Sequence, residues 1–194
     1  SVSPEELPES SRFFKAIART VSDYGMQNAS MDKIASQLNM KKSSLYFHFA
    51  NKEKMMKSMF AEEQQTMEAV YKRYSRAFPD PWGKIFCYAF MATSYLINKP
   101  EMIITIGWLR MQFNYFTIKQ DRKRQFGEGA LYLLEPFSSD AFDLHGLNPG
   151  EAVFLFNIHL TREIIHSFHS GMEKQEIYSR IHRICSLFHS GLEG

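Results

Sequence analysis

The sequence predicts an all-α protein. Its 194 residues include 10 glycines and 7 prolines, a smaller share of turn-forming residues than globular proteins usually have. No proline occurs between Glu9 and Phe78, and Gly25 is the one glycine in that stretch, so helices can run there without interruption. Apolar residues, which make up 44% of the chain, recur at helical spacing. This composition also excludes wholesale disorder.

The first helix is expected over residues 10–24. Gly25 should end it, because a left-handed backbone conformation costs glycine least. The apolar positions of this helix repeat at i, i+4 and i+8, which gives it one face for the core. They are Phe13, Phe14, Ile17 and Val21.

Three further helices are expected before Phe78. Ser30 is suited to cap the first of them and Asn51 the last, while Asn39 suits a turn position with positive φ. Leu45 and Phe49, at i and i+4, should point inward. The expected ranges are residues 31–38, residues 42–49, and a long helix from the Asn51 cap to about residue 76.

Two short helices joined by a turn of three or four residues form a helix-turn-helix, and positive charge gathers around this one. Residues 11–57 carry nine Lys and Arg against three acids, whereas residues 58–194 are close to neutral. A helix fits the major groove of DNA, and its exposed side chains can read base edges. Here the exposed positions are Lys42, Ser43, Tyr46 and Phe47. A solvated helical face would explain the charge equally simply, but it would not explain an exposed phenylalanine.

The run SMDKIASQLNMKKSSLYFHFANKEKM, Ser30 to Met55, resembles the DNA-binding signature of the TetR/AcrR family of transcriptional regulators. That signature has a Thr- or Ser-initiated helix, an Ile-Ala pair, a Leu-Gly-Val turn, then Lys-Gly-Thr-Leu-Tyr, an aromatic residue or His, Phe, and Lys-Glu. The resemblance extends back to about Phe13. Asn39, Lys41 and Ser43 depart from the usual Gly, Ser and Gly, and none of these changes should break the fold.

The resemblance implies a protein in two parts. A disordered arm over residues 1–10 should precede a DNA-binding domain over residues 11–50, and a helical ligand-binding and dimerisation domain should occupy residues 51–194. The implied protein is a cytoplasmic repressor that a small apolar ligand releases from a palindromic operator in double-stranded DNA. Two cysteines fit a reducing cytosol. No signal peptide or membrane span is expected, because residues 1–10 lack an apolar segment and the longest uncharged stretch, residues 85–98, is short.

The resemblance also implies which side chains meet DNA. Ser30 and Lys52, at the starts of two helices, would hold phosphates, as would Tyr46 and His48. The start of the third helix, with Phe47, would face the groove. The full set expected at DNA is Ser30, Lys41, Lys42, Ser43, Ser44, Tyr46, Phe47, His48 and Lys52.

Beyond Pro81 the chain should form helices over residues 82–98, 101–117, 119–134, 151–170 and 172–190, with a loop over residues 135–150. The last two are apolar on more than one side, so one face should meet the core and another a partner. Pairing with a second copy would give a two-fold, four-helix interface. The residues expected there are Phe156, Leu160, Ile164, Ile177, Ile181, Ile184 and Phe188.

The middle of the chain is rich in methionine and aromatic residues. Most of these should simply be core, but such side chains also adapt to varied small molecules. The family places an effector here, and the scarcity of charge favours an apolar one. The residues expected to line the pocket are Met67, Tyr71, Phe86, Phe90, Met91, Tyr95, Met102, Trp108, Met111 and Phe126.

A helical, metal-dependent enzyme with an incidental basic end is the alternative. Glu163 and His166 have the ExxH spacing of di-iron bundles, but such a site needs a second ExxH, and the chain has none. Two groups share a helix face and could bind a metal, although such residues more often line a polar interface. They are His159, Glu163 and His166, and His182, Cys185 and His189. We expect no catalytic residues, no cofactor and no metal.

Overall fold

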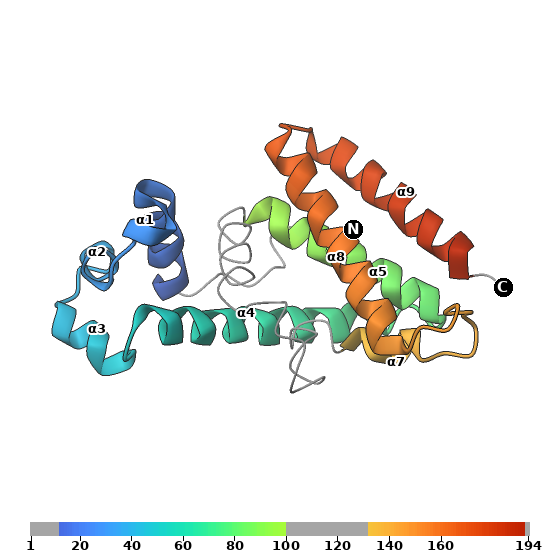
Figure 1. Ribbon diagram of the computed structural model, residues 1–194, viewed down its shortest axis with the longest axis horizontal. Coiled ribbons are helices and arrows are strands. Elements are labelled where there is room, and N and C mark those ends of the chain that lie inside the picture. The colour runs from blue at the N-terminus through green and yellow to red at the C-terminus, as the bar shows by residue number, and fades with distance from the viewer. Residues whose placement is uncertain (1–11, 100–131, 193–194) are drawn as a thin grey trace. The chain divides into compact units, whose positions relative to one another are not determined.

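The computed structural model describes residues 12–99 and 132–192, in which every regular element is a helix (Figure 1). The predicted all-α class is confirmed. The helices are α1 (Arg12–Asn28), α2 (Met31–Gln37), α3 (Lys42–His48), α4 (Lys52–Ser75), α5 (Pro81–Asn98), α7 (Leu134–Phe137), α8 (Pro149–His169) and α9 (Lys174–Leu192). The arm expected over residues 1–10, the helix expected over 101–117 and nearly all of the one expected over 119–134 lie outside the described residues.

The described residues fall into two compact units. The first unit contains α1, α2, α3 and α4 as far as Thr66, together with Lys99. The second unit contains α4 from Met67 onward, with α5, α7, α8 and α9. Helix α4 is a single helix of 24 residues (Figure 1) and therefore contributes to both units. The domain boundary expected between residues 50 and 51 stays a prediction.

Side-chain caps and one turn residue set the helix ends of the first unit. Ser30 Oγ accepts a hydrogen bond from the backbone N–H of Lys33 at 3.3 Å, and Asn51 Oδ1 accepts one from Lys54 at 2.8 Å. Asn39 has a φ of 52°. The two caps and the left-handed turn residue therefore occur where the sequence predicts them.

Gly25 takes the expected left-handed conformation, with a φ of 73°, but α1 does not end there. The helix resumes for one more turn as far as Asn28. Its hydrogen bonding continues because the backbone N–H of Ala29 donates to the carbonyl oxygen of Gly25 at 3.0 Å. The prediction that the helix ends at Tyr24 is corrected to a kink, which glycine accepts without a steric penalty.

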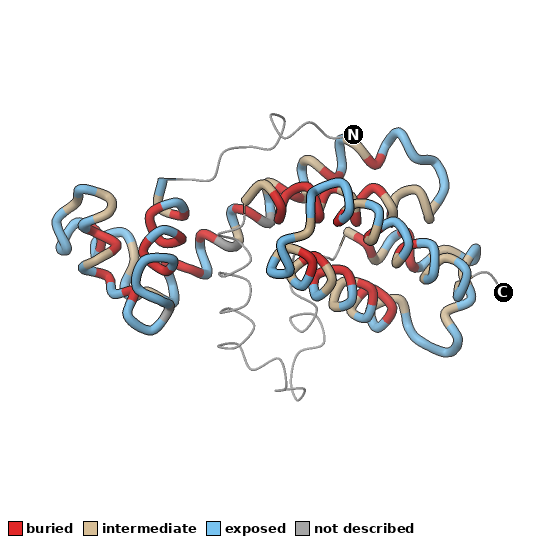
Figure 2. Tube along the Cα trace, turned by 90° about the horizontal axis from the view of Figure 1, so that it is seen from above, coloured by how far each residue is buried: buried red, intermediate tan, exposed pale blue. Residues whose placement is uncertain are grey.

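The apolar stripe of α1 builds the core of the first unit, and Figure 2 shows buried positions along its helices. Phe13 departs from the expected stripe because it is half-buried, and its ring meets that of Phe49 edge-on with centroids 5.5 Å apart. The largest fully buried side chains of this unit are Phe14, Ile17, Ile34, Leu45, Met55 and Met56.

In the second unit, α5 packs against α9, and α8 packs against α7 and α9. Asn148 and Glu151 form a capping box at the start of α8, with hydrogen bonds of 3.0 and 2.9 Å. The prediction of a loop over residues 135–150 is wrong for its first residues, because the short helix α7 extends to Phe137 and contains Pro136. Proline is tolerated there because the first turn of a helix makes no use of its backbone N–H groups.

The Asn51 cap should stabilise the start of α4. Replacing Asn51 with alanine removes the acceptor for Lys54 N–H, so we expect the free energy of unfolding to fall by about 0.5–2 kcal/mol. Asn51→Asp keeps the acceptor and should match the parent within about 0.5 kcal/mol. Urea unfolding followed by circular dichroism measures both variants. An equal loss in the two would show that the cap contributes nothing.

Candidate functional site

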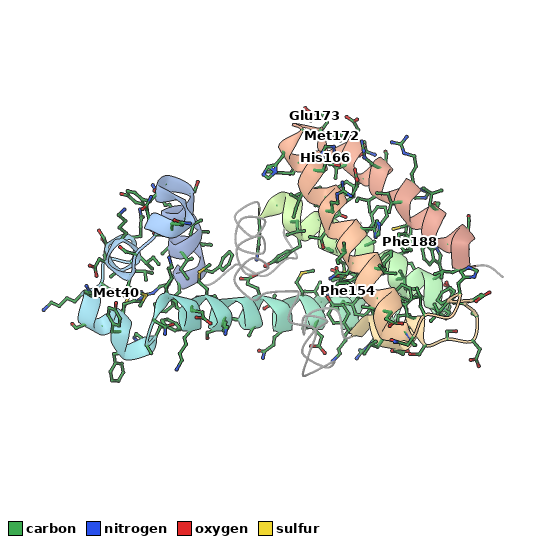
Figure 3. The ribbon with its side chains drawn as sticks, viewed as in Figure 1. Met40, Phe154, His166, Met172, Glu173 and Phe188 are labelled. Atoms are coloured by element: carbon green, nitrogen blue, oxygen red, sulfur yellow. The ribbon has the colours of Figure 1, made fainter. Side chains whose placement is uncertain are left out.

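Helix α3 is held against the first unit by one apolar side chain and by the turn that precedes it. Leu45 is completely buried, and its carbonyl oxygen accepts the backbone N–H of Phe49 at 2.9 Å. In the turn, the N–H of Met40 donates to the carbonyl oxygen of Ala35 at 2.9 Å, and Figure 3 labels Met40 at this point. With Leu45 inward, the opposite side of α3 faces solvent.

Two aromatic side chains stand on the exposed side of α3. Phe47 is 88% exposed and Tyr46 is 43% exposed. The imidazole of His48 meets the Phe47 ring edge-on, with centroids 5.7 Å apart. A nearly fully exposed phenylalanine between two other ring side chains gives the helix an apolar contact point without contributing to its own core.

Lys42, the first residue of α3, forms an ion pair with Asp32 of α2. Its Nζ lies 2.8 Å from one carboxylate oxygen of Asp32 and 2.9 Å from the other. This hydrogen bond and the charge of the carboxylate raise the pKa of Lys42 above its ordinary value. Both side chains are well exposed, so the pair orients Lys42 more than it stabilises the fold.

Lys52, the first residue of α4, directly follows the Asn51 cap and is half-buried. Burial lowers the pKa of Lys52 below its ordinary value. A cation that has lost part of its water shell gains from an anionic neighbour, and the N-terminal end of α4 adds a favourable field for such an anion. This corner of the first unit therefore suits a phosphate.

The structure places seven of the predicted DNA-binding residues together on α3 and at its start. They are Lys41, Lys42, Ser43, Ser44, Tyr46, Phe47 and His48, and all are exposed. Lys41 precedes the helix and makes no side-chain capping hydrogen bond. Ser30 is exposed at the start of α2, where its hydroxyl is used in the cap. Contact of these residues with DNA stays a prediction.

Sequence reasoning missed two contacts beside this face. It did not find the ion pair between Asp32 and Lys42, nor the cation–π contact in which Lys33 Nζ lies 4.0 Å from the centroid of the Tyr24 ring. Partners nine or ten residues apart on different helices leave no periodic signal in a sequence.

The residues expected around an effector differ in how far they are buried in the second unit. Met67, Tyr71, Met91 and Tyr95 are buried. Phe86 and Phe90 are instead half-buried against α9. The Phe86 ring meets His182 edge-on at 5.3 Å between centroids, and Phe90 stacks on Tyr178 at 5.7 Å. Met102, Trp108, Met111 and Phe126 lie outside the described residues.

The residues expected at a dimer interface are mostly used within the chain itself. Five of them are buried in the second unit: Phe156, Leu160, Ile164, Ile177 and Ile181. Almost none of their surface is exposed in the single chain, where α5, α8 and α9 pack against one another, and their contact with a second copy stays a prediction. The two remaining residues, Ile184 and Phe188, are half-buried and line an open groove of about 430 Å³ together with side chains of α8. Figure 3 labels His166 of α8 and Phe188 of α9, which both border this groove.

No group of three or more His, Cys, Asp or Glu side chains within residues 12–99 and 132–192 could hold a metal ion. Glu163 of the ExxH pair forms an ion pair with Arg180 instead. His159 Nδ1 lies 2.8 Å from the carbonyl oxygen of Leu155. Among the described helices, none is long and apolar enough to cross a bilayer.

Residues 13–59 match the model of a family described as bacterial regulatory proteins, tetR family. The fold is similar to a solved structure from work on the molecular basis for control of antibiotic production by bacterial hormones. The TM-score is 0.68 and the sequence identity 17%, and the match covers 94% of this chain and 96% of the other. No curated protein matches the sequence.

A helix-turn-helix with a basic and aromatic outer face, followed by a helical body, defines a DNA-binding transcriptional regulator. The family match covers α1, α2, α3 and the beginning of α4. The chain carries the DNA-binding domain of the bacterial tetR family, as the motif between Ser30 and Met55 predicts.

Neighbouring residues of α3 should respond in opposite ways to truncation. Leu45→Ala empties a fully buried position and should lower the free energy of unfolding by about 2–5 kcal/mol. Phe47→Ala removes a ring that is 88% exposed and should change it by less than about 0.5 kcal/mol. Urea unfolding of the two variants tests this contrast. A comparable loss for Phe47→Ala would mean that its ring packs within the protein and is not available to a partner.

Proposed function

We propose that the protein is a homodimeric repressor that binds a palindromic operator and is released from it by a small effector. The observation that carries this proposal is the outer face of α3, where Tyr46 and Phe47 are exposed beside Lys41 and Lys42, and where Lys52 follows at the next helix start. A purely structural helical hairpin needs none of these side chains at its surface.

Helix α3 would lie in the major groove. Lys41, which precedes the helix, and Lys42 and Ser43 of its first turn would then lie near base edges and phosphates, while Phe47 suits a thymine methyl group or a sugar. Lys52 and Tyr46 would hold phosphates and so contribute affinity without base discrimination. Lys42 is oriented by Asp32 before binding, which reduces the conformational freedom it loses in the groove.

Pairing through α8 and α9 would bring two copies of α3 onto successive half-sites, about one turn of DNA apart. The face left for pairing consists of the groove with Ile184 and Phe188 together with two exposed leucines. Leu187 of α9 is 74% exposed, and Leu155 of α8 is also exposed. An isologous interface needs one apolar patch that serves both copies, and these side chains supply it.

The effector would act through α4. This helix begins with Lys52 near the proposed phosphate contacts and carries Met67 and Tyr71 in the second unit. Because a continuous helix is stiff, a shift at Tyr71 is transmitted to Lys52. The effector weakens DNA binding only as far as it prefers the DNA-incompetent state. The similar solved structure comes from work on control by bacterial hormones, which supports a small signalling molecule as the effector.

Selection of bound duplexes from a random DNA pool tests this function directly. We expect enrichment of an inverted repeat whose half-sites lie about one helical turn, or a multiple of it, apart. Recovery of no enriched sequence would contradict the proposal. An enriched site without two-fold symmetry would contradict the dimer.

Lys52→Ala should weaken binding to every DNA sequence alike. We expect a loss of about 1–2 kcal/mol and a salt dependence that is shallower by about one unit of slope, because one phosphate contact disappears. Lys72→Ala is the matched control, since Lys72 lies far along the same helix in an exposed ion pair with Glu68. Affinity is measured on selected and scrambled duplexes over a range of salt. If both variants show the same loss, general charge explains it and Lys52 has no specific role.

Leu187→Glu should separate the dimer without unfolding the subunit. Leu187 is 74% exposed in one chain, so the new carboxylate stays in water when the protein is monomeric. In a dimer it would be buried twice without a partner, at a cost of several kcal/mol. Leu147→Glu, at a 41% exposed position before α8, is the control and should stay dimeric. Sedimentation at micromolar concentration measures the oligomeric state of both variants. If Leu187→Glu remains a dimer, the interface does not include Leu187.

A further inference from the structure

Three tyrosines from three segments meet inside the second unit. Tyr71 of α4 stacks on Tyr132, which precedes α7, with ring centroids 4.7 Å apart. Tyr88 of α5 meets both rings edge-on, at 6.3 Å from Tyr71 and 5.5 Å from Tyr132. Tyr71 is 4% exposed, and Tyr88 is also buried. We call these three residues the tyrosine cluster.

The hydroxyl groups of the cluster are unequally satisfied. Tyr88 Oη donates to Asn157 Oδ1 of α8 at 2.8 Å. Tyr71 Oη is fully buried and has no hydrogen-bond partner within the described part of the chain. Ser75, one turn further along α4, acts to lower the pKa of Tyr71 but does not meet its hydroxyl in hydrogen-bonding geometry. Buried hydroxyl groups are nearly always paired, so this one calls for a partner that is not part of the described protein.

The surroundings of Tyr71 keep it neutral and therefore a donor. Burial raises the pKa of Tyr71 to about 12 and raises the pKa of Tyr132 as well. The pKa of the neighbouring Cys87 thiol is likewise raised by burial, to about 11. The charge of Glu135 adds to the effect on Tyr71. The Glu135 carboxylate is itself paired with Lys84, whose Nζ lies 2.7 Å away. The tyrosine cluster therefore offers a ligand neutral phenols and favours a neutral molecule.

We propose that the tyrosine cluster is the polar end of the effector site, and that Tyr71 Oη donates a hydrogen bond to the carbonyl oxygen of a neutral ligand with an apolar body. This inference rests on the proposed function, because it deepens the effector site of that proposal. The stacked rings and Met67, one turn before Tyr71 on α4, supply apolar surface for the rest of the ligand. A ligand held by Tyr71 acts directly on the helix that begins at Lys52.

Two variants test, in the absence of a ligand, whether the Tyr71 hydroxyl has a hydrogen-bond partner inside the protein. Tyr71→Phe removes an unpaired hydroxyl, so its urea unfolding midpoint should equal or exceed that of the parent. Tyr88→Phe is the matched control, because it leaves Asn157 Oδ1 without its donor and should lower the midpoint. A lowered midpoint for Tyr71→Phe as well would show that the Tyr71 hydroxyl already has a partner inside the protein, and this would overturn the proposal.

Acetophenone and ethylbenzene are a matched pair of probes that differ in the carbonyl group. Their dissociation constants are measured on the full chain by chemical-shift titration of methyl-labelled methionines, read at Met67. We expect the parent to bind acetophenone about 3- to 10-fold more tightly than ethylbenzene, and Tyr71→Phe to lose this preference. Equal binding of the two probes by the parent, a preference that persists in Tyr71→Phe, or no binding of either probe overturns the proposal.

Probe binding is measured on protein without DNA, so its result does not depend on whether the protein binds an operator. If no DNA sequence is enriched from the random pool, the proposed function fails, while the ketone preference still tests the tyrosine cluster as a binding site. If DNA is enriched but the ketone preference is absent, the regulator stands and its effector binds elsewhere.

Discussion

The burial of Leu45 is the interaction on which the exposed outer face of α3 depends. A helix of seven residues is marginal in water without tertiary contacts, and Lys41 gives α3 no side-chain cap. Leu45 is its one fully buried side chain, and this contact fixes the rotation of α3 about its own axis. Two residues further on, a helix has turned by roughly 200°. Phe47 must therefore face solvent when Leu45 faces the core, and its exposure is a consequence of the packing.

Features that depend on residues close together in the chain could be predicted from the sequence. The caps at Ser30 and Asn51 and the left-handed turn at Asn39 each depend on a few consecutive residues. The outer face of α3 could also be predicted, because its motif fixes both helix period and residue types. The ion pair between Asp32 and Lys42 could not, since it depends on the angle between α2 and α3.

Apolar periodicity indicates that a side chain is buried but does not say what buries it. Ile177 and Ile181 follow the stripe expected of α9, and both are buried as expected. Helix α9 packs against α5 and α8 of the same chain, so its apolar stripe does not by itself indicate a surface for a second copy. The proposed pairing face includes Leu187, whose exposure could be recognised only after the core had been assigned. For the same reason, the aromatic content of α5 did not separate Phe86 and Phe90, which pack on α9, from Tyr88 in the tyrosine cluster.

Two of the buried polar side chains of helix α4, Glu63 and Tyr71, differ in their hydrogen bonding. In the first unit, Glu63 Oε2 lies 3.3 Å from Lys99 Nζ, and both side chains are nearly buried. Breaking such a pair leaves an uncompensated buried charge, so it strongly favours one position of the helix. In the second unit, Tyr71 Oη is buried without a partner among the described residues, so its surroundings do not favour one position in this way. A ligand can therefore gain free energy at Tyr71 by satisfying a donor that the protein leaves unused, whereas at Glu63 it would have to compete with an existing ion pair. In the proposed regulator, this asymmetry favours Tyr71 over Glu63 as the position on α4 at which an effector acts.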